Sequence, residues 1–195
     1  MASSWIEWTA VVTGVLCVIF NTRNSVWGWP TGLISVGLYI YVFFAAKLYA
    51  DTLLQVYFVA TGIYGWHQWL HGGQAHHELP ITRLSRREWL QWMGLGLAGS
   101  VLLGFLFDTY TDAALPWPDS FVTAFSFIAQ FLLARRKLEN WIFWLAVDVA
   151  AIGVYWAKDL KPTALLYLIY LGLASYGLVH WRQLARRTES NPKPL

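Results

Sequence analysis

The fold is decided by residues 139–148, which read Glu-Asn-Trp-Ile-Phe-Trp-Leu-Ala-Val-Asp and open a long apolar helical segment. At 100° per residue, Trp141, Trp144 and Asp148 share one helix face. Asp148 lies roughly 12 Å along the axis from Asn140 at 1.5 Å per residue. In a helix that spans a bilayer, this depth is near the middle of a ~30 Å hydrocarbon core. An ionisable residue there usually faces a cavity and has a function. The alternative is a protonated Asp148 bonded to a neighbouring helix.

The composition of the whole chain supports a membrane location for this segment. Of the 195 residues, 57% are hydrophobic and 13% are charged, and there are 13 Trp, 10 Tyr and 11 Phe. A soluble domain of this size could not bury so much apolar surface. The apolar residues form runs of roughly 17 to 21, the length of a transmembrane helix. The sequence therefore predicts an all-α polytopic membrane protein.

Seven spans are expected, and none of them shows the alternation of a β-barrel strand. Their approximate bounds are 8–20, 26–46, 50–70, 89–107, 120–134, 140–157 and 163–181. Eleven Lys and Arg residues lie on the side of the Arg135–Lys137 loop and three on the other side. The positive-inside rule makes the eleven-charge side cytoplasmic, so the N terminus is expected outside and the C terminus inside. This distribution also explains the pI of about 9.0 without a nucleic-acid partner.

The two ends of the chain resemble each other when the sequence is shifted by 112 residues. Trp29 then aligns with Trp141, and Trp69 with Trp181. We therefore expect two parallel three-helix repeats joined by a linker helix, an arrangement typical of transporters. The expected parts are a first repeat at 4–70, the linker helix at 88–108, a second repeat at 118–182 and a cytoplasmic tail at 183–195.

Polar side chains inside the spans are candidates for ligand binding. Ser126 and Gln130 share one face of the fifth span, and Gln55 aligns with Tyr167 in the repeat. Such groups either bond one helix to another or bind the amide and hydroxyl groups of a ligand. Trp144, one turn deeper than Trp141 and aligned with Asp148, could stack on a flat cationic ligand.

Other residues have simpler interpretations. Trp66, Trp69 and Trp181 lie near the cytoplasmic interface and are expected to belong to an aromatic belt. His67, His71, His76 and His77 lack the companion ligands of a metal site, so no metal is expected. The chain has no phosphate-binding loop and no nucleophile–base set, so neither ATP hydrolysis nor another enzyme activity is expected.

Six further stretches are distinctive, namely 27–30, 48–55, 64–66, 126–134, 139–148 and 166–167. On these stretches, which extend over nearly the whole chain, the sequence resembles the Pnu family of vitamin transporters. The resemblance implies a 3+1+3 helix arrangement like that of the SWEET sugar transporters, and a homotrimer in a bacterial inner membrane. It implies no cofactor. It also adds Asn140 to the expected substrate-binding residues, which are Trp141, Trp144, Asp148, Gln130, Ser126, Asn140, Gln55 and Tyr167.

The substrate that the resemblance implies is nicotinamide riboside. It would enter by facilitated diffusion and be trapped by phosphorylation in the cytoplasm. Some members of the family carry thiamine or riboflavin, and thiamine is also an aromatic cation, so an aromatic wall beside Asp148 does not separate the two cations. A membrane-embedded enzyme or receptor is the alternative from another class.

Overall fold

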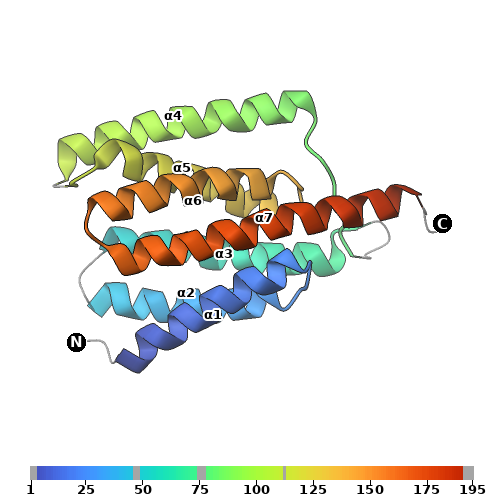
Figure 1. The fold of residues 1–195 in the computed structure, drawn as a ribbon, viewed down its shortest axis with the longest axis horizontal. Helices are drawn as coiled ribbons and strands as arrows, with labels where there is room; N and C mark the ends of the chain where they lie inside the picture. The colour runs from blue at the N-terminus through green and yellow to red at the C-terminus, as the bar shows by residue number, and fades with distance from the viewer. Residues whose placement is uncertain (1–3, 46–48, 74–77, 112, 191–195) are drawn as a thin grey trace. The chain divides into compact units, whose positions relative to one another are not determined.

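The described part of the protein is entirely built on α-helices. The computed structural model describes residues 4–45, 49–73, 78–111 and 113–190 (Figure 1). Seven α-helices lie in these ranges, as the sequence predicted. They are α1 (Ser4–Thr22), α2 (Gly28–Ala45), α3 (Tyr49–His71), α4 (Arg86–Tyr110), α5 (Pro116–Ala134), α6 (Asn140–Ala157) and α7 (Lys161–Ser190). The last helix extends nine residues beyond the expected seventh span, which ended at Trp181.

Four of these helices, α2, α4, α6 and α7, are long and apolar enough to cross a membrane. Helix α1 contributes a shorter apolar stretch, Trp8–Thr22. Helix α5 carries five polar residues among its hydrophobic ones, namely Asp119, Ser120, Thr123, Ser126 and Gln130. Polar residues inside a membrane bundle usually face its interior, so the composition of α5 points to a ligand-facing helix.

The chain divides into two compact units. The first contains Met1–Pro80 with Ala134–Arg136, and the second contains Ile81–Leu133 with Lys137–Leu195. Helices α1, α2 and α3 belong to the first unit, and α4, α5, α6 and α7 belong to the second. Within the first unit α2 packs against both α1 and α3, and within the second α6 packs against α7 (Figure 1).

A pair of tryptophans fixes the packing inside the first unit. Trp29 and Trp69 meet edge to face, with ring centroids 5.3 Å apart and planes at 87°. Gly65 lies under the Trp29 ring, and a Cβ at this glycine would come within 2.3 Å of the ring. Any larger residue at Gly65 would therefore push Trp29 out of its place.

The second unit repeats this arrangement 112 residues later. Trp141 and Trp181 meet with centroids 5.5 Å apart and planes at 86°. A Cβ at Gly177 would come within 2.8 Å of the Trp141 ring. Two tryptophans and one glycine thus occupy equivalent positions with the same local geometry in both units, which is what an internal repeat requires.

The connection before α2 and the connection before α6 also follow the repeat. The Ser25 amide donates to Phe20 O at 2.9 Å, and the Lys137 amide donates to Leu132 O at 2.9 Å. Asn24 has a φ of 55° and its equivalent Arg136 has a φ of 52°. Left-handed backbone at a residue other than glycine costs roughly 1–2 kcal/mol, so both turns need stabilising contacts.

The prediction of an aromatic belt is wrong for two of its three residues. Trp69 and Trp181 are 0% exposed, whereas a belt tryptophan faces the lipid headgroups. Each of them is instead the edge-on partner of the tryptophan that begins the repeat. Trp66 is 37% exposed and remains compatible with a belt position.

Arg136 is buried in the first unit. It is 3% exposed, its guanidinium lies 4.5 Å from the Trp69 ring centroid, and its Nε donates to Asn24 Oδ1 at 2.9 Å. A second guanidinium nitrogen donates to Leu79 O. Burial lowers the pKa of Arg136 and the nearby Glu78 opposes this effect, but an arginine stays charged in proteins. These contacts stabilise the left-handed turn between α5 and α6.

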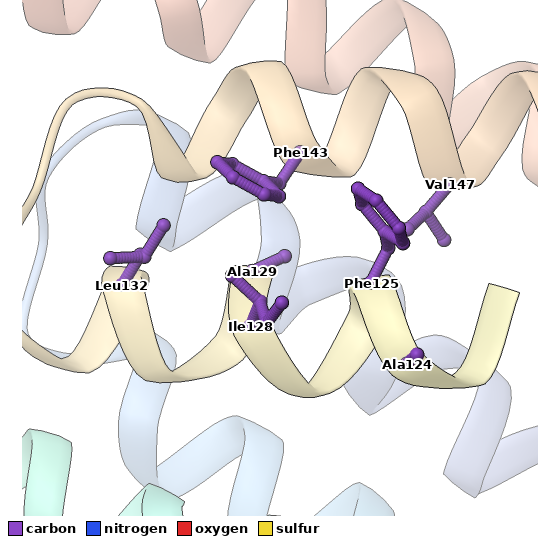
Figure 2. Packing of buried hydrophobic residues seen from close by; sticks show 7 residues of the cluster. All are labelled: Ala124, Phe125, Ile128, Ala129, Leu132, Phe143 and Val147. Carbon is purple, nitrogen blue, oxygen red and sulfur yellow. The ribbon is translucent and has the colours of Figure 1, made fainter. Parts of the chain in front are cut away.

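The core of the second unit lies between α5 and α6. Figure 2 shows side chains of both helices meeting there, and the cluster consists of Ala124, Phe125, Ile128, Ala129, Leu132, Phe143 and Val147. Stacked and edge-on rings join Phe125 and Phe143 to Phe121 and Trp89. This apolar interface fixes the rotation of α6 about its axis, and therefore the direction of its polar residues.

An ion pair joins the other ends of the same two helices. Lys158, at the C-terminal end of α6, donates to both carboxylate oxygens of Asp119 at 2.8 and 2.6 Å. Both side chains are about a quarter exposed. The pair connects the first turn of α5 to the last turn of α6.

Candidate functional site

Asp148 is the most unusual polar residue of the second unit. It is 3% exposed and lies in the middle of α6, one of the helices able to cross a membrane. Among the residues that the structure describes, no side chain forms a hydrogen bond or an ion pair with the Asp148 carboxylate. Burying a charged carboxylate without a partner costs several kcal/mol. Asp148 therefore needs either a proton or a cation.

Trp144 lies one turn from Asp148 on α6. It is partly buried and packs against the core between α5 and α6. Because the core holds part of the indole and leaves part accessible, Trp144 is suited to stack on a flat ligand near the carboxylate.

Asn140 and Trp141 begin α6 and are almost completely buried, at 0% and 2% exposure. The Asn140 amide nitrogen donates to Lys137 O at 2.7 Å. Within the described part of the chain, Asn140 Oδ1 and Trp141 Nε1 have no hydrogen-bond partner. Trp29 Nε1, at the equivalent position of the first unit, has none either. The Trp141 ring thus packs the repeat as Trp29 does, while its indole N–H and Asn140 Oδ1 are buried without a partner among the described residues.

Ser126 and Gln130 lie one turn apart on α5, and both are partly exposed. Neither side chain bonds to another residue of the described ranges. The hydroxyls of Ser120 and Thr123, in contrast, donate to backbone carbonyls one turn earlier, at 2.6 and 2.9 Å. Ser126 and Gln130 are therefore the available hydrogen-bonding groups of this helix.

Tyr167 comes from α7, which packs against α6. Its ring stacks on that of Tyr155 at 5.2 Å and 22°, and meets Tyr170 edge to face at 5.8 Å and 90°. The sequence analysis missed Tyr155 and Tyr170. The signal that could have found Tyr155 is its spacing, because it lies seven residues after Asp148 and hence on the same face of α6.

Seven of the eight predicted site residues belong to three helices of the second unit. Gln55, the eighth, lies on α3 in the first unit and is partly exposed. Its share in the site remains a prediction.

A comparison of equivalent positions in the two repeats distinguishes residues that packing requires from residues that a binding site would require. Trp141 has its equivalent in Trp29 and packs in the same way. Four candidate residues whose side chains could contact a ligand have apolar residues or glycine at the equivalent positions of the first repeat. The pairs are Ser126 and Gly14, Gln130 and Val18, Trp144 and Gly32, and Asp148 and Val36. A residue that both repeats need for packing should appear in both, so these four residues point to a single site in the second repeat.

The predicted site is not an open pocket. A surface cavity of about 250 Å³ is lined by Leu84, Ser85, Arg86, Trp89, Glu139 and Ile142, and none of these is a predicted site residue. Asp148 itself is 3% exposed, so its carboxylate is almost completely shielded from solvent.

The described histidines belong to no recognisable metal site. His67 and His71 stack on α3 with centroids 5.1 Å apart. Groups of three or more potential metal ligands are absent from the described ranges. His76 and His77 lie outside these ranges.

Comparisons with known proteins agree on one family. The family model described as "Nicotinamide mononucleotide transporter" matches residues 4–183. The nicotinamide riboside transporter PnuC of Neisseria mucosa is 32% identical, over 94% of this chain and 74% of that protein. PnuC of Escherichia coli K12 is 28% identical, over 96% of this chain and 89% of that one.

A relative with another printed substrate is nearly as similar. The riboflavin/roseoflavin transporter RibM of Streptomyces davaonensis is 27% identical, over 96% of this chain and 89% of that protein. Among solved structures, the crystal structure of the vitamin B3 transporter PnuC has a TM-score of 0.75 and 30% identity, and it covers 95% of this chain and 83% of that one.

Proposed function

The chain belongs to the nicotinamide mononucleotide transporter family, and from this premise we propose that it carries nicotinamide riboside into the cell. The family makes the protein a multi-pass membrane transporter and not an enzyme. Which vitamin it carries must be argued from its own residues, because relatives of nearly equal identity are named for riboside and for flavin.

The observation that carries the proposal is the buried, unpartnered carboxylate of Asp148 beside Trp144. Nicotinamide riboside contains a pyridinium ring, which is flat, aromatic and positively charged. A carboxylate and an aromatic face together attract such a cation through charge and cation–π interaction. The flavin ring of riboflavin is uncharged, so Asp148 would have to bind a proton beside it and would gain no charge attraction from the ligand.

In this proposal each predicted residue has one role. Asp148 neutralises the pyridinium charge and Trp144 stacks on the ring. Gln130, Ser126 and Tyr167 bind the amide and the ribose hydroxyls, and Asn140 and Trp141 offer the free oxygen and indole N–H at the start of α6. Gln55, on α3 of the first unit, stays a predicted substrate-binding residue. Transport by facilitated diffusion, trapping by cytoplasmic phosphorylation and a homotrimeric assembly are parts of the same proposal.

Uptake of labelled nicotinamide riboside by proteoliposomes tests the proposal. Unlabelled riboside should compete strongly and riboflavin weakly. Thiamine, the second candidate substrate, is also an aromatic cation, and competition equal to that by riboside would assign the site to cationic vitamins in general. Absence of riboside uptake, with uptake of riboflavin, would contradict the proposal.

Replacing Trp144 by alanine should weaken riboside binding. Losing a stacking partner costs roughly 1–2 kcal/mol, which is a factor of about 5 to 30 in Kd. Calorimetry on the purified protein measures the change. The matched control is Trp156→Ala on the same helix, because Trp156 is 65% exposed and should leave Kd unchanged. Equal affinities for the Trp144 variant and the wild type would remove Trp144 from the site.

We also propose that the loop between α5 and α6 is cytoplasmic, from the eleven-to-three division of basic residues. A cysteine at Arg135 in a Cys17→Ala background should react with a membrane-impermeant maleimide only after the cells are permeabilised. Arg135 is the right position because it is exposed, whereas the neighbouring Arg136 is buried.

A cysteine at the exposed Lys161, expected on the outer side, is the control and should react in intact cells. The opposite labelling pattern would reverse the orientation.

A further inference from the structure

The first residues of α4 carry positive charges that no other described residue neutralises. Arg83, Arg86 and Arg87 are exposed, and within the described ranges none of their guanidinium groups has a hydrogen bond or an ion pair. Arg86 and Arg87 belong to the first turn of α4, which is long and apolar enough to cross a membrane. The unpaired charges therefore lie where a membrane helix begins, at the depth of lipid headgroups.

Two carboxylates beside these arginines already have partners. Glu88 Oε2 accepts a hydrogen bond from a backbone amide at 2.7 Å, and Glu88 Oε1 lies 3.8 Å from Lys137 Nζ. Glu139 Oε2 accepts from another backbone amide at 2.9 Å. Because neither carboxylate pairs with Arg86 or Arg87, the positive charge of these two residues remains available to an anion.

Arg86 lines two surface cavities. One has a volume of about 250 Å³ and is also lined by Trp89 and Ile142. The other has a volume of about 540 Å³ and is also lined by Arg87 and Leu90. Each cavity thus combines a guanidinium group with apolar walls. The ligand that complements both features has an anionic group and an apolar part.

An exposed apolar face continues along α4 from the second cavity. Positions 86, 90, 94, 97 and 101 follow one side of the helix, and Leu90, Leu97 and Val101 are each more than half exposed. Position 94 is a glycine, and a Cβ there would meet no atom within 4 Å. Open space therefore separates Leu90 from Leu97 on this face, and an acyl chain can lie there with its headgroup at Arg86.

We propose that this end of α4 binds an anionic phospholipid, with the phosphate held by Arg86 and Arg87 and an acyl chain lying along Leu90, Gly94 and Leu97. The planar guanidinium group matches a phosphate with two parallel hydrogen bonds. Basic cavities at the ends of membrane helices suit anionic headgroups for this reason. The lipid site shares no residue with the predicted vitamin site, and the inference does not depend on which vitamin the protein carries.

Lipid titration of the full-length protein in a neutral detergent tests the inference. Native mass spectrometry measures the Kd of the first bound phosphatidylglycerol molecule. The double variant Arg86→Gln/Arg87→Gln should bind this lipid about thirtyfold more weakly, since each basic residue at a lipid surface contributes a factor of about five. Both side chains are exposed and unpaired within the described ranges, so the variant should keep its melting temperature without lipid.

Arg182→Gln/Arg186→Gln is the matched control. These two arginines lie on α7, are exposed and line neither cavity, and their replacement removes the same charge. This variant should keep the wild-type Kd for phosphatidylglycerol. An equal loss of affinity in both double variants would reduce the effect to net charge and overturn the inference.

Two further ligands identify the group that is recognised. Phosphatidylcholine, whose choline cation offsets the phosphate charge, should bind about tenfold more weakly than phosphatidylglycerol. Glycerol 3-phosphate, which has no acyl chain, should not displace the bound lipid at equal concentration. Equal binding of phosphatidylcholine would show that charge is not recognised, and displacement by glycerol 3-phosphate would assign the cavities to a free phosphate ester. Either result overturns the inference, as does a wild-type protein that binds no phosphatidylglycerol.

Discussion

Replacing Asp148 by asparagine should weaken the binding of nicotinamide riboside by about 100-fold and leave the protein folded. Two opposite charges ~5 Å apart attract each other by about 3 kcal/mol at an effective dielectric constant of ~20, which corresponds to a factor of about 100 to 300 in Kd. Asparagine keeps the shape of the side chain and removes the charge. Calorimetry measures the loss, and thermal unfolding in detergent reports on the fold.

The uncharged dihydro form of the riboside provides the control for this variant. Its affinity should be unchanged or higher for Asp148→Asn, because no carboxylate charge has to be buried with a neutral ligand. If Asp148 serves only as a structural contact between helices, the variant should lose thermal stability and keep its affinity for the cation. That result would remove Asp148 from the site.

The second large effect concerns phosphate. Nicotinamide mononucleotide should compete with the riboside at least about 1,000 times more weakly than unlabelled riboside does. No Lys or Arg occurs between residues 88 and 134, between 138 and 157, or between 162 and 181. Lys158, at the end of α6, is already paired with Asp119 at 2.6 Å. Burying a phosphate without a cationic partner costs several kcal/mol per charge, and an ionised Asp148 would repel it.

The description of the family model names the mononucleotide and the curated relatives are named for the riboside, so this experiment separates the two. Excess mononucleotide is added outside proteoliposomes while uptake of labelled riboside is measured. A riboside with a neutral methyl group on its 5′ oxygen is the size control and should compete better than the mononucleotide. Equal competition by mononucleotide and riboside would mean that a basic group reaches the site.

Helices α2, α4, α6 and α7 could be predicted from the sequence because each is a long apolar run, and length and hydropathy decide whether such a run can cross a bilayer. The environment of single residues could not be predicted in the same way. Trp69 and Trp181 have the residue type and the position near the end of a span that are typical of an aromatic belt, yet both are buried against another tryptophan. Hydropathy does not distinguish a side chain that faces lipid from one that faces protein, because both surroundings are apolar.

Arg136 shows a second limit. Arginines beside membrane spans usually reach water, and the sequence offered no reason to treat Arg136 differently from Arg135. Its burial depends on Asn24, Leu79 and Trp69, which are far away in the chain. The candidate site was easier to predict, because an Asp in an apolar helix is costly wherever its partners lie. The contacts of Tyr155 and Tyr170 with Tyr167 were not predicted, because tyrosines are common in membrane helices and their neighbours do not follow from hydropathy.

The ion pair between Lys158 and Asp119 also affects how a substrate reaches the protein. Under the proposed orientation, Lys158 lies at the outer surface, where a cation arrives. An unpaired lysine would repel such a cation and slow its encounter with the entrance. With the Asp119 carboxylate 2.6 Å from the ammonium group, the two charges form a short dipole. The field of this dipole fades within a few ångströms and is screened beyond about 8 Å at physiological ionic strength. An arriving riboside therefore meets almost no net charge at the Lys158–Asp119 pair.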